Sequence, residues 1–399
     1  MNRIKEFAGE FARSVAFICE RSPLAADRPL RWTVIANTAA GGFTIGKRLL
    51  AHRAALEAAV KKAAPMRLYH AEPSLTSRKA GSRFAEYGFY ETKAAGNAAM
   101  ITRDLLEEAL SAGSEAENPL FLVLSSGGDG TALEILCEFH KRITAAPDVA
   151  AKLRDSFVFL RLPMGTGNDG ADAPNLGDAL DTLLEARGRV YSSAVRLSTS
   201  THGKGPFYAF NILSAGLDAF VSRWTNRMKG RLPGDSYKLW LDAASLFYSK
   251  IHKVGLMDVR VRDETYGPVK HFREKTLLLA VGASGRRTYG AGNRILPDDR
   301  NVCMMREMPV LRKIAIKGLV ARGEHGGCPE VRLFSARRVE FTCEYPILAQ
   351  TDGETVLLEP SDFPAAIDVS EPLVPLLSRT PCKRIALAYG VCYSPRSGE

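Results

Sequence analysis

Residues 120–134 read LFLVLSSGGDGTALE and carry the strongest structural signal in the chain. An uninterrupted apolar run leads here into glycines, an acid and a hydroxyl, and residues 132–142 continue with helical spacing. Continuous apolar runs of this length are typical of strands that are buried on both faces, as in a parallel sheet. The stretch therefore predicts a buried strand, a glycine loop and the start of a helix, in that order.

The loop after this strand has the composition of an anion-binding site. Glycines let the backbone approach phosphates closely, and a helix N-terminus supplies unpaired N–H donors. Because a bare carboxylate would repel phosphate, we expect Mg²⁺ to bridge Asp129 to ATP. A tight turn capped by Asp129 or Thr131 is the purely structural alternative. The residues expected to contact the nucleotide here are Gly127, Gly128, Asp129, Gly130 and Thr131.

A second glycine loop follows a second apolar strand. Residues 158–162 predict the strand, and residues 162–169, LPMGTGND, form the loop. In a parallel sheet this loop lies beside the first, so we expect the two to enclose one nucleotide. Neither is a Walker loop, because the chain contains no GxxxxGK[ST] pattern. The candidate residues here are Gly165, Thr166, Asn168 and Asp169.

The first half of the chain alternates between strand and helix patterns. Such alternation predicts an α/β domain with a mostly parallel sheet, whose ligand loops gather at the carboxyl ends of the strands. We place this domain at residues 32–190. Besides the segments above, the predicted strands are 32–36 and 66–70, and the predicted helices are 49–60, 94–112 and 176–186.

The rest of the chain has a different pattern. Residues 191–375 hold short strand-like runs separated by turns, which predicts an antiparallel, sandwich-like sheet domain. Helical stretches at 218–228 and 235–250 interrupt it. Residues 1–31 predict an amphipathic helix, which we expect to dock on the protein's own surface rather than on a membrane. Residues 376–399 form a C-terminal tail.

Composition narrows the classes of partner. Hydrophobic residues make up 46% and charged residues 25%, as in an ordinary globular protein. The net charge of +10 favours polyanions, which are nucleic acid, nucleotide phosphates or an anionic membrane surface. Nucleic acid is disfavoured, because the basic residues are dispersed and no nucleic-acid motif accompanies them. Seven scattered cysteines without a CxxC pair, and no long apolar run, predict a cytoplasmic protein with reduced thiols.

Residues 127–131, with Glu134 three positions on, resemble the signature of the diacylglycerol kinase catalytic-domain family. That family includes sphingosine and ceramide kinases and bacterial lipid kinases, and its glycine–acid loop is shared with NAD kinases. Other blocks between residues 32 and 375 agree in order. They are Asn37 to Gly41, similar to the first phosphate loop; Thr92 with Gly96 and Ala98, similar to the adenine-side block; 163–169, the second nucleotide loop; 211–219, the strand and turn that join the domains; and 351–354, the late acidic loop.

The resemblance implies a role for the late acidic loop, whose residues alone would read as a hairpin turn. It implies that Glu354 accepts the proton of the lipid hydroxyl, that Asp352 assists, and that Glu134 lies among the nucleotide contacts. Some bacterial members hold a second, structural magnesium, for which Asp299 is the candidate ligand. Arg300 stands where those members have glycine, which argues against this second metal site.

The expected protein is an ATP-dependent lipid kinase of lipid metabolism with ATP and Mg²⁺ as cofactors. It would transfer the γ-phosphate to a hydroxyl of diacylglycerol, a sphingoid base or a similar lipid, in a cleft between the two domains. The alternatives are a kinase of a soluble substrate, such as an NAD kinase, and a catalytically silent regulator that binds lipid or nucleotide. We expect a cytoplasmic location, with peripheral contact at the inner face of the membrane.

Overall fold

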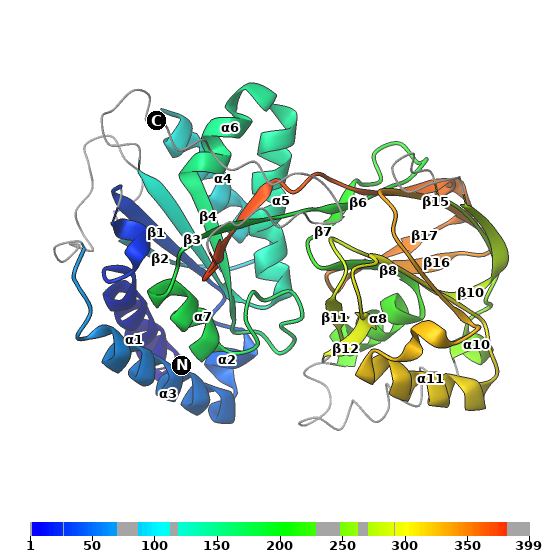
Figure 1. The fold of residues 1–399 in the computed structure, drawn as a ribbon, viewed down its shortest axis with the longest axis horizontal. Coiled ribbons are helices and arrows are strands. Elements are labelled where there is room, and N and C mark those ends of the chain that lie inside the picture. The colour runs from blue at the N-terminus through cyan, green and yellow to red at the C-terminus, as the bar shows by residue number, and fades with distance from the viewer. Residues whose placement is uncertain are drawn as a thin grey trace. The chain divides into compact units, whose positions relative to one another are not determined.

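The computed structural model describes residues 2–26, 28–69, 87–111, 119–228, 248–261, 270–290 and 292–380. The chain forms two compact units (Figure 1). The first comprises Met1–Ser192 and the segment from Pro372 onward, and the second comprises Ser193–Glu371. The predicted fold class is confirmed, since the first unit has a mostly parallel sheet and the second an antiparallel one.

The sheet of the first unit has the strand order β2-β1-β3-β4-β19-β5. Its neighbours are parallel except for the last pair, in which β5 runs antiparallel to β19. Every residue of β3 and β4 is buried, as their continuous apolar sequences predict. The strands are β1 (Leu30–Ala36), β2 (Tyr87–Glu91), β3 (Leu120–Gly127), β4 (Phe157–Pro163), β5 (Gly188–Ser192) and β19 (Val374–Ser378).

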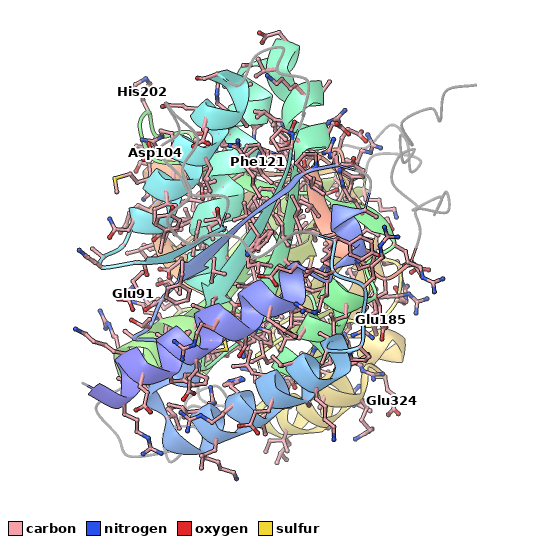
Figure 2. All side chains as sticks on the ribbon, turned by 90° about the vertical axis from the view of Figure 1, so that its left-hand side faces the viewer. Glu91, Asp104, Phe121, Glu185, His202 and Glu324 are labelled. Carbon is pink, nitrogen blue, oxygen red and sulfur yellow. The ribbon has the colours of Figure 1, made fainter. Side chains whose placement is uncertain are left out.

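Helices cover both faces of this sheet. One face packs against α1 (Asn2–Cys19), α3 (Gly46–Ala63) and α7 (Leu176–Leu184), and Figure 2 shows α1 and α3 side by side in front of the strands. The other face carries α4 (Asn97–Ser111), α5 (Asp129–Ala145) and α6 (Pro147–Ser156). The short α2 (Gly41–Thr44) and a 3₁₀ turn at Pro23–Ala25 complete the unit.

The N-terminal helix docks on its own unit, as the sequence predicts. Its apolar side chains Phe7, Phe11, Val15 and Ile18 are fully buried. Phe7 and Phe11 pack on Phe43, with ring centroids 5.7 and 5.6 Å apart. Burial of four large apolar side chains contributes several kcal/mol, at about 1.5–3 kcal/mol each. The helix is therefore part of the core of the first unit.

One predicted strand is wrong. Residues 66–69 of the predicted strand 66–70 form no strand, and residue 70 lies outside the described residues. The backbone N–H of Tyr69 instead donates to the carbonyl of Glu20, 3.0 Å away, at the end of α1. The place beside β1 is taken by β2, which pairs Trp32 with Tyr87 and Ala36 with Glu91.

The second unit is an antiparallel sheet in which the long β10 pairs with β9 along its first half and with β8 and β13 along its second. The path through the sheet is β17-β16-β8-β10-β9-β15-β18-β6-β7, with β13 and β14 beside β10. The strands are β6 (Val195–Ser198), β7 (Phe207–Ala209), β8 (Ile212–Gly216), β9 (Leu256–Val261), β10 (Lys270–Gly282), β13 (Val302–Arg306), β14 (Val331–Phe334), β15 (Arg338–Cys343), β16 (Ile347–Thr351), β17 (Glu354–Leu358) and β18 (Ala365–Val369).

One face of this sheet is covered by a helical layer of α8 (Leu217–Met228), α10 (Tyr248–Ile251) and α11 (Val310–Arg322) (Figure 1). A small hairpin of β11 (Arg287–Tyr289) and β12 (Asn293–Leu296) packs beside α11. The predicted helix 218–228 matches α8. Most of the predicted helix 235–250 lies outside the described residues, and α11 was not predicted. Across the described part of the chain, no helix is long and apolar enough to span a bilayer.

Candidate active site

Three loops of the first unit meet at the carboxyl ends of β1, β3 and β4, where a parallel sheet places its ligand loops. The backbone N–H of Asn37, after β1, donates to Ser126 O at 2.8 Å. The N–H of Gly42 donates to Met164 O in the loop after β4, also at 2.8 Å. The N–H of Thr92, after β2, donates to Ala36 O at 2.8 Å. The predicted nucleotide loops are thus joined by backbone hydrogen bonds.

The glycines let these loops approach one another. A Cβ atom on Gly165 would lie 2.5 Å from Gly128 Cα, and one on Gly41 would lie 2.8 Å from Thr166 Oγ1. A Cβ on Gly127 would lie 2.6 Å from Thr131 Oγ1. Contacts this short do not occur at a real Cβ atom, so a side chain at position 165 would push the loop after β4 away from the backbone of the loop after β3. At Gly41 and Gly127 the close atom is a threonine hydroxyl, which can turn away. Gly165 is therefore the position at which the approach of the two loops requires glycine.

Asp129 stands at the first position of α5, beside the second glycine loop. Its Oδ1 accepts the backbone N–H of Gly170 at 3.1 Å, and the side chain is half-buried. No cluster of three or more carboxylate, histidine or cysteine side chains suited to a metal occurs among the described residues. Mg²⁺ is commonly held by one or two carboxylates together with substrate phosphates. Asp129 and the glycine cradle fit that mode of binding.

The second loop is braced at its tip and at its base. Asn168 Oδ1 accepts the N–H of Gly165 at 2.7 Å, and its Nδ2 donates to Gly165 O at 3.2 Å. At the base, Arg161 forms a buried ion pair with Asp172 at 2.6 Å. Thr166 at the tip is exposed and Asp169 is half-buried. The loop is therefore held in shape before any ligand binds.

Glu134 has a structural partner. Its two carboxylate oxygens accept the backbone N–H groups of Gly96 and Ala98, at 2.8 and 3.1 Å. These groups lie at the N-terminus of α4, where helical N–H donors lack partners and a negative charge is favourable. Glu134 thus ties α5 to the start of α4, where Gly96 and Ala98 of the predicted adenine-side block lie.

Two functional candidates were missed by sequence reasoning, and both lie on α3. Arg48 Nη1 donates to Gly165 O at 2.8 Å, which brings a guanidinium group to the rim of the cradle. His52 follows one turn later, and burial together with the nearby Arg48 lowers its pKa. Arginine is well suited to bind phosphate. The only sequence signal was the basic pair Lys47-Arg48 after the first loop.

The late acidic loop lies in the second unit, between β16 and β17. Asp352 has a left-handed backbone, with φ of 48°, and its carboxylate accepts three backbone N–H groups. Their donors are Phe210 at 2.6 Å, Asn211 at 3.0 Å and Ile212 at 3.0 Å. Asp352 therefore anchors the hairpin to the start of β8. Glu354, by contrast, is exposed at the first position of β17.

A buried polar network continues from this hairpin. Gln350 Oε1 accepts the N–H of Gly353 at 2.7 Å, and its Nε2 donates to Ser214 Oγ at 2.9 Å. Ser214 in turn donates to Asp218 Oδ2 at 2.7 Å. Asp218 lies in the first turn of α8. The network, which sequence reasoning did not identify, fixes the acidic hairpin to that helix.

The predicted second-metal ligand carries an ion pair instead. Asp299 Oδ1 lies 2.7 Å from Arg286 Nε, and this guanidinium lowers the pKa of Asp299. Asp298 pairs with Arg300, whose Nε donates to Asp298 Oδ1 at 2.9 Å. Each acid at this turn therefore has an arginine as its cation, and Asp299 as a metal ligand stays a prediction.

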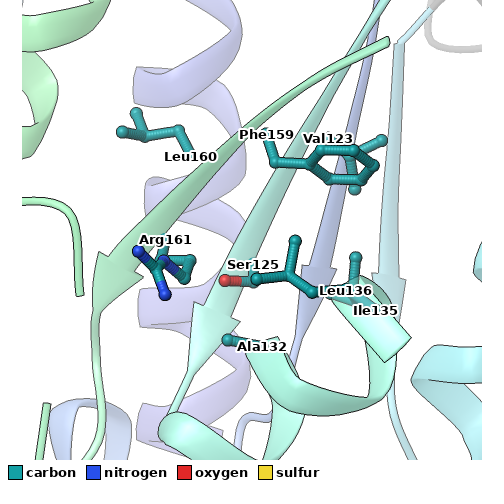
Figure 3. A pocket seen from close by; sticks show the side chains of 8 residues that line it. All are labelled: Val123, Ser125, Ala132, Ile135, Leu136, Phe159, Leu160 and Arg161. Carbon is teal, nitrogen blue, oxygen red and sulfur yellow. The ribbon is translucent and has the colours of Figure 1, made fainter. Parts of the chain in front are cut away.

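A small cavity between the sheet and α5 is a gap in packing and not a ligand pocket. Figure 3 shows Ser125 and Arg161 on neighbouring strands, facing the first turns of α5. The charge of Arg161 is already balanced by Asp172, and apart from Ser125 the rest of the lining is apolar. The lining residues are Val123, Ser125, Ala132, Ile135, Leu136, Phe159, Leu160 and Arg161.

No family model and no curated protein matches this chain. Solved structures do. Two are crystal structures from Bacillus anthracis str. Sterne, of a diacylglycerol kinase and of a putative diacylglycerol kinase. Both alignments cover 87% of this chain, with 96% and 97% of those chains, at 14% and 16% identity and TM-scores of 0.50 and 0.51. The resemblance to the diacylglycerol kinase catalytic-domain family is thereby confirmed at the level of the fold.

Proposed function

We propose that the chain is an ATP-dependent lipid kinase, which transfers the γ-phosphate to a hydroxyl group of an amphiphilic acceptor. The observation that carries this proposal is the meeting of the three loops around Asp129, at the carboxyl ends of β1, β3 and β4. The fold shared with proteins named as diacylglycerol kinases supports the same class of reaction.

In this proposal ATP binds to the first unit. The glycine loop 127–131 and the guanidinium of Arg48 would bind the phosphates, and Asp129 would hold Mg²⁺ together with them. The metal neutralises the negative charge that spreads over the phosphoryl oxygens during transfer. Thr92 and the start of α4, shaped by Glu134, serve the adenine side.

Glu354 is assigned as the proton acceptor for the lipid hydroxyl. Within the described part of the chain its carboxylate has no hydrogen bond and no ion pair, so it is available to contact a substrate hydroxyl. The carboxylate of Asp352 accepts three backbone N–H groups, which suits it to hold the loop. Deprotonation of the acceptor needs only a modest base, because phosphoryl transfer depends mainly on positioning and electrostatics.

The acceptor is proposed to be a lipid such as diacylglycerol or a sphingoid base. The large second unit, Ser193–Glu371, favours this over a soluble-substrate kinase, because the chains named as diacylglycerol kinases align over almost their whole length. A silent regulator is disfavoured, since mere binding does not require Asp129 and Glu354 together.

Labelled ATP, offered with vesicles that each contain one candidate lipid, tests the proposal. We expect label in one lipid class, and none when Asp129→Asn replaces the wild type. Label transferred only to a soluble alcohol such as NAD would support the soluble-substrate kinase. Nucleotide binding without transfer to any acceptor would indicate a silent regulator.

A further inference from the structure

The outer face of α11 is unusually apolar for a surface helix. The side chains of Leu311 and Ile314 are 82% and 49% exposed, and Ala315 beside them is also exposed. Positions 311, 314 and 315 follow the spacing i, i+3, i+4, so they form one ridge along the helix. A surface helix normally has polar residues on its exposed face, because an apolar side chain lowers the free energy of the protein only when it is removed from water.

The ridge is not the side of α11 that belongs in the core, because the opposite side of the helix already packs there. Ile316 is buried in the core beneath the helical layer, and Val320 packs against it. Lys313 is buried and bonds to Glu307 at 2.7 Å. Gly323, with φ of 78°, ends the helix in a left-handed cap. The fold therefore holds Leu311 and Ile314 outward on a rigid support.

The charges of α11 indicate which surface would cover this ridge. Its sequence, VLRKIAIKGLVAR, contains basic residues and no acid. Arg312 and Arg322 are ion-paired with acids outside the helix, Glu330 at 2.9 Å and Glu324 at 2.8 Å. Lys317 is exposed and lies one turn beyond Ile314 on the same side. Apolar residues flanked by lysine and arginine are the pattern of helices that lie in the interface of an anionic bilayer. The net charge of +10 adds longer-range attraction to such a surface.

We propose that α11 docks the second unit on an anionic lipid bilayer. Leu311 and Ile314 enter the boundary between headgroups and acyl chains, and Lys317 lies at the level of the lipid phosphates. A second copy of the chain fits less well, because a stable dimer buries about 800 Å² per partner and the ridge offers only two large apolar side chains. The inference deepens the proposed function, since it brings the acidic loop's unit to the lipid that it would phosphorylate.

Vesicle flotation of the full-length protein without nucleotide tests this docking. The vesicles are phosphatidylcholine alone, or phosphatidylcholine with 30 mol% phosphatidylglycerol (about one lipid in three charged). The test variant is Leu311→Gln with Ile314→Gln, since glutamine keeps helix propensity. The matched control is Leu50→Gln with Met100→Gln, which removes two side chains of the first unit that are 55% and 51% exposed.

We expect wild type and control to bind the anionic vesicles alike, and the test variant to bind at least about 10-fold more weakly, because two inserted apolar side chains are lost. Binding that is equal for all three proteins would overturn the proposal. A second result would also overturn the proposal: the wild type is a dimer without lipid, and the test variant is a monomer that still binds vesicles. The ridge would then be a contact between two copies of the chain.

The two proposals fail separately. Flotation does not require catalysis, so vesicle binding with no kinase activity in the wild type would refute the kinase and leave the docking surface intact. Kinase activity toward a dispersed short-chain acceptor should be equal in the test variant and the control, because none of the four residues belongs to the loops 37–41, 127–131 and 163–169. Loss of that activity in the test variant alone would count against a docking role.

Discussion

Replacing Asp352 by asparagine separates a structural role of this carboxylate from a chemical one. Asparagine has nearly the same shape as aspartate, and it also tolerates the left-handed backbone at this position. Oδ1 can still accept Asn211 and Ile212, but an amide nitrogen now meets the N–H of Phe210, which Oδ2 accepted at 2.6 Å. One charge-assisted hydrogen bond is lost and a buried donor is left without a partner, which costs about 2–4 kcal/mol.

That loss is large beside the roughly 5–15 kcal/mol that stabilises a typical domain. For a unit of this size it lowers the melting temperature by about 5–10 °C. Calorimetry of the full chain measures it, and Glu354→Gln in the same hairpin is the control, because an exposed substitution there should change stability by less than about 0.5 kcal/mol. An Asp352→Asn protein that melts like the wild type yet has lost turnover would refute the structural role and place Asp352 in the chemistry.

Three further outcomes are expected. Asp129→Asn should abolish turnover and leave the melting curve unchanged, since it removes the proposed anchor of the metal; near-normal turnover would remove Asp129 from the site. Gly165→Ala should weaken ATP binding at least about 10-fold in a nucleotide titration, because the new Cβ would lie 2.5 Å from Gly128 Cα, whereas Gly46→Ala, whose Cβ meets open space, should not. Asp362 has its pKa lowered to about 2, chiefly by its bond to Lys204, so its contribution to stability is present above about pH 4 and is lost as the pH falls toward 2. Asp362→Asn should make the free energy of unfolding depend less on pH between about 4 and 2. The same pH dependence in variant and wild type would contradict this role of Asp362.

The sequence was sufficient for those parts of the fold that local patterns encode. Strand β3 and helix α5 were predicted because an unbroken apolar run, glycines and a helical period follow one another within residues 120–142. The second glycine loop was found for the same reason. Most predicted site residues of the first unit lie on these two loops, and the structure brings Asn37, Gly128 and Gly165 to one edge of the sheet.

What the sequence did not reveal depends on tertiary contacts. Strand β19 returns from the second unit to pair with β4 and β5, and no local pattern encodes a pairing at that separation. Helix α11 lacks an amphipathic period, because its outer face is as apolar as its inner one. The partner of Arg48 is a carbonyl more than a hundred residues away. The cap that Glu134 makes on α4 appears only once two helices pack together, and its role as a nucleotide contact stays a prediction.

The assignment of Glu354 as the proton acceptor of a lipid kinase is tested most directly by one paired measurement. Phosphorylation rate and nucleotide dissociation constant are determined on the same preparations of wild type and Glu354→Gln. A general base contributes about 10²–10⁴-fold, so the rate should fall by that factor while the dissociation constant moves little. An unchanged rate would reduce the acidic loop to a hairpin turn, and a loss of nucleotide affinity equal to the loss of rate would place Glu354 on the metal instead.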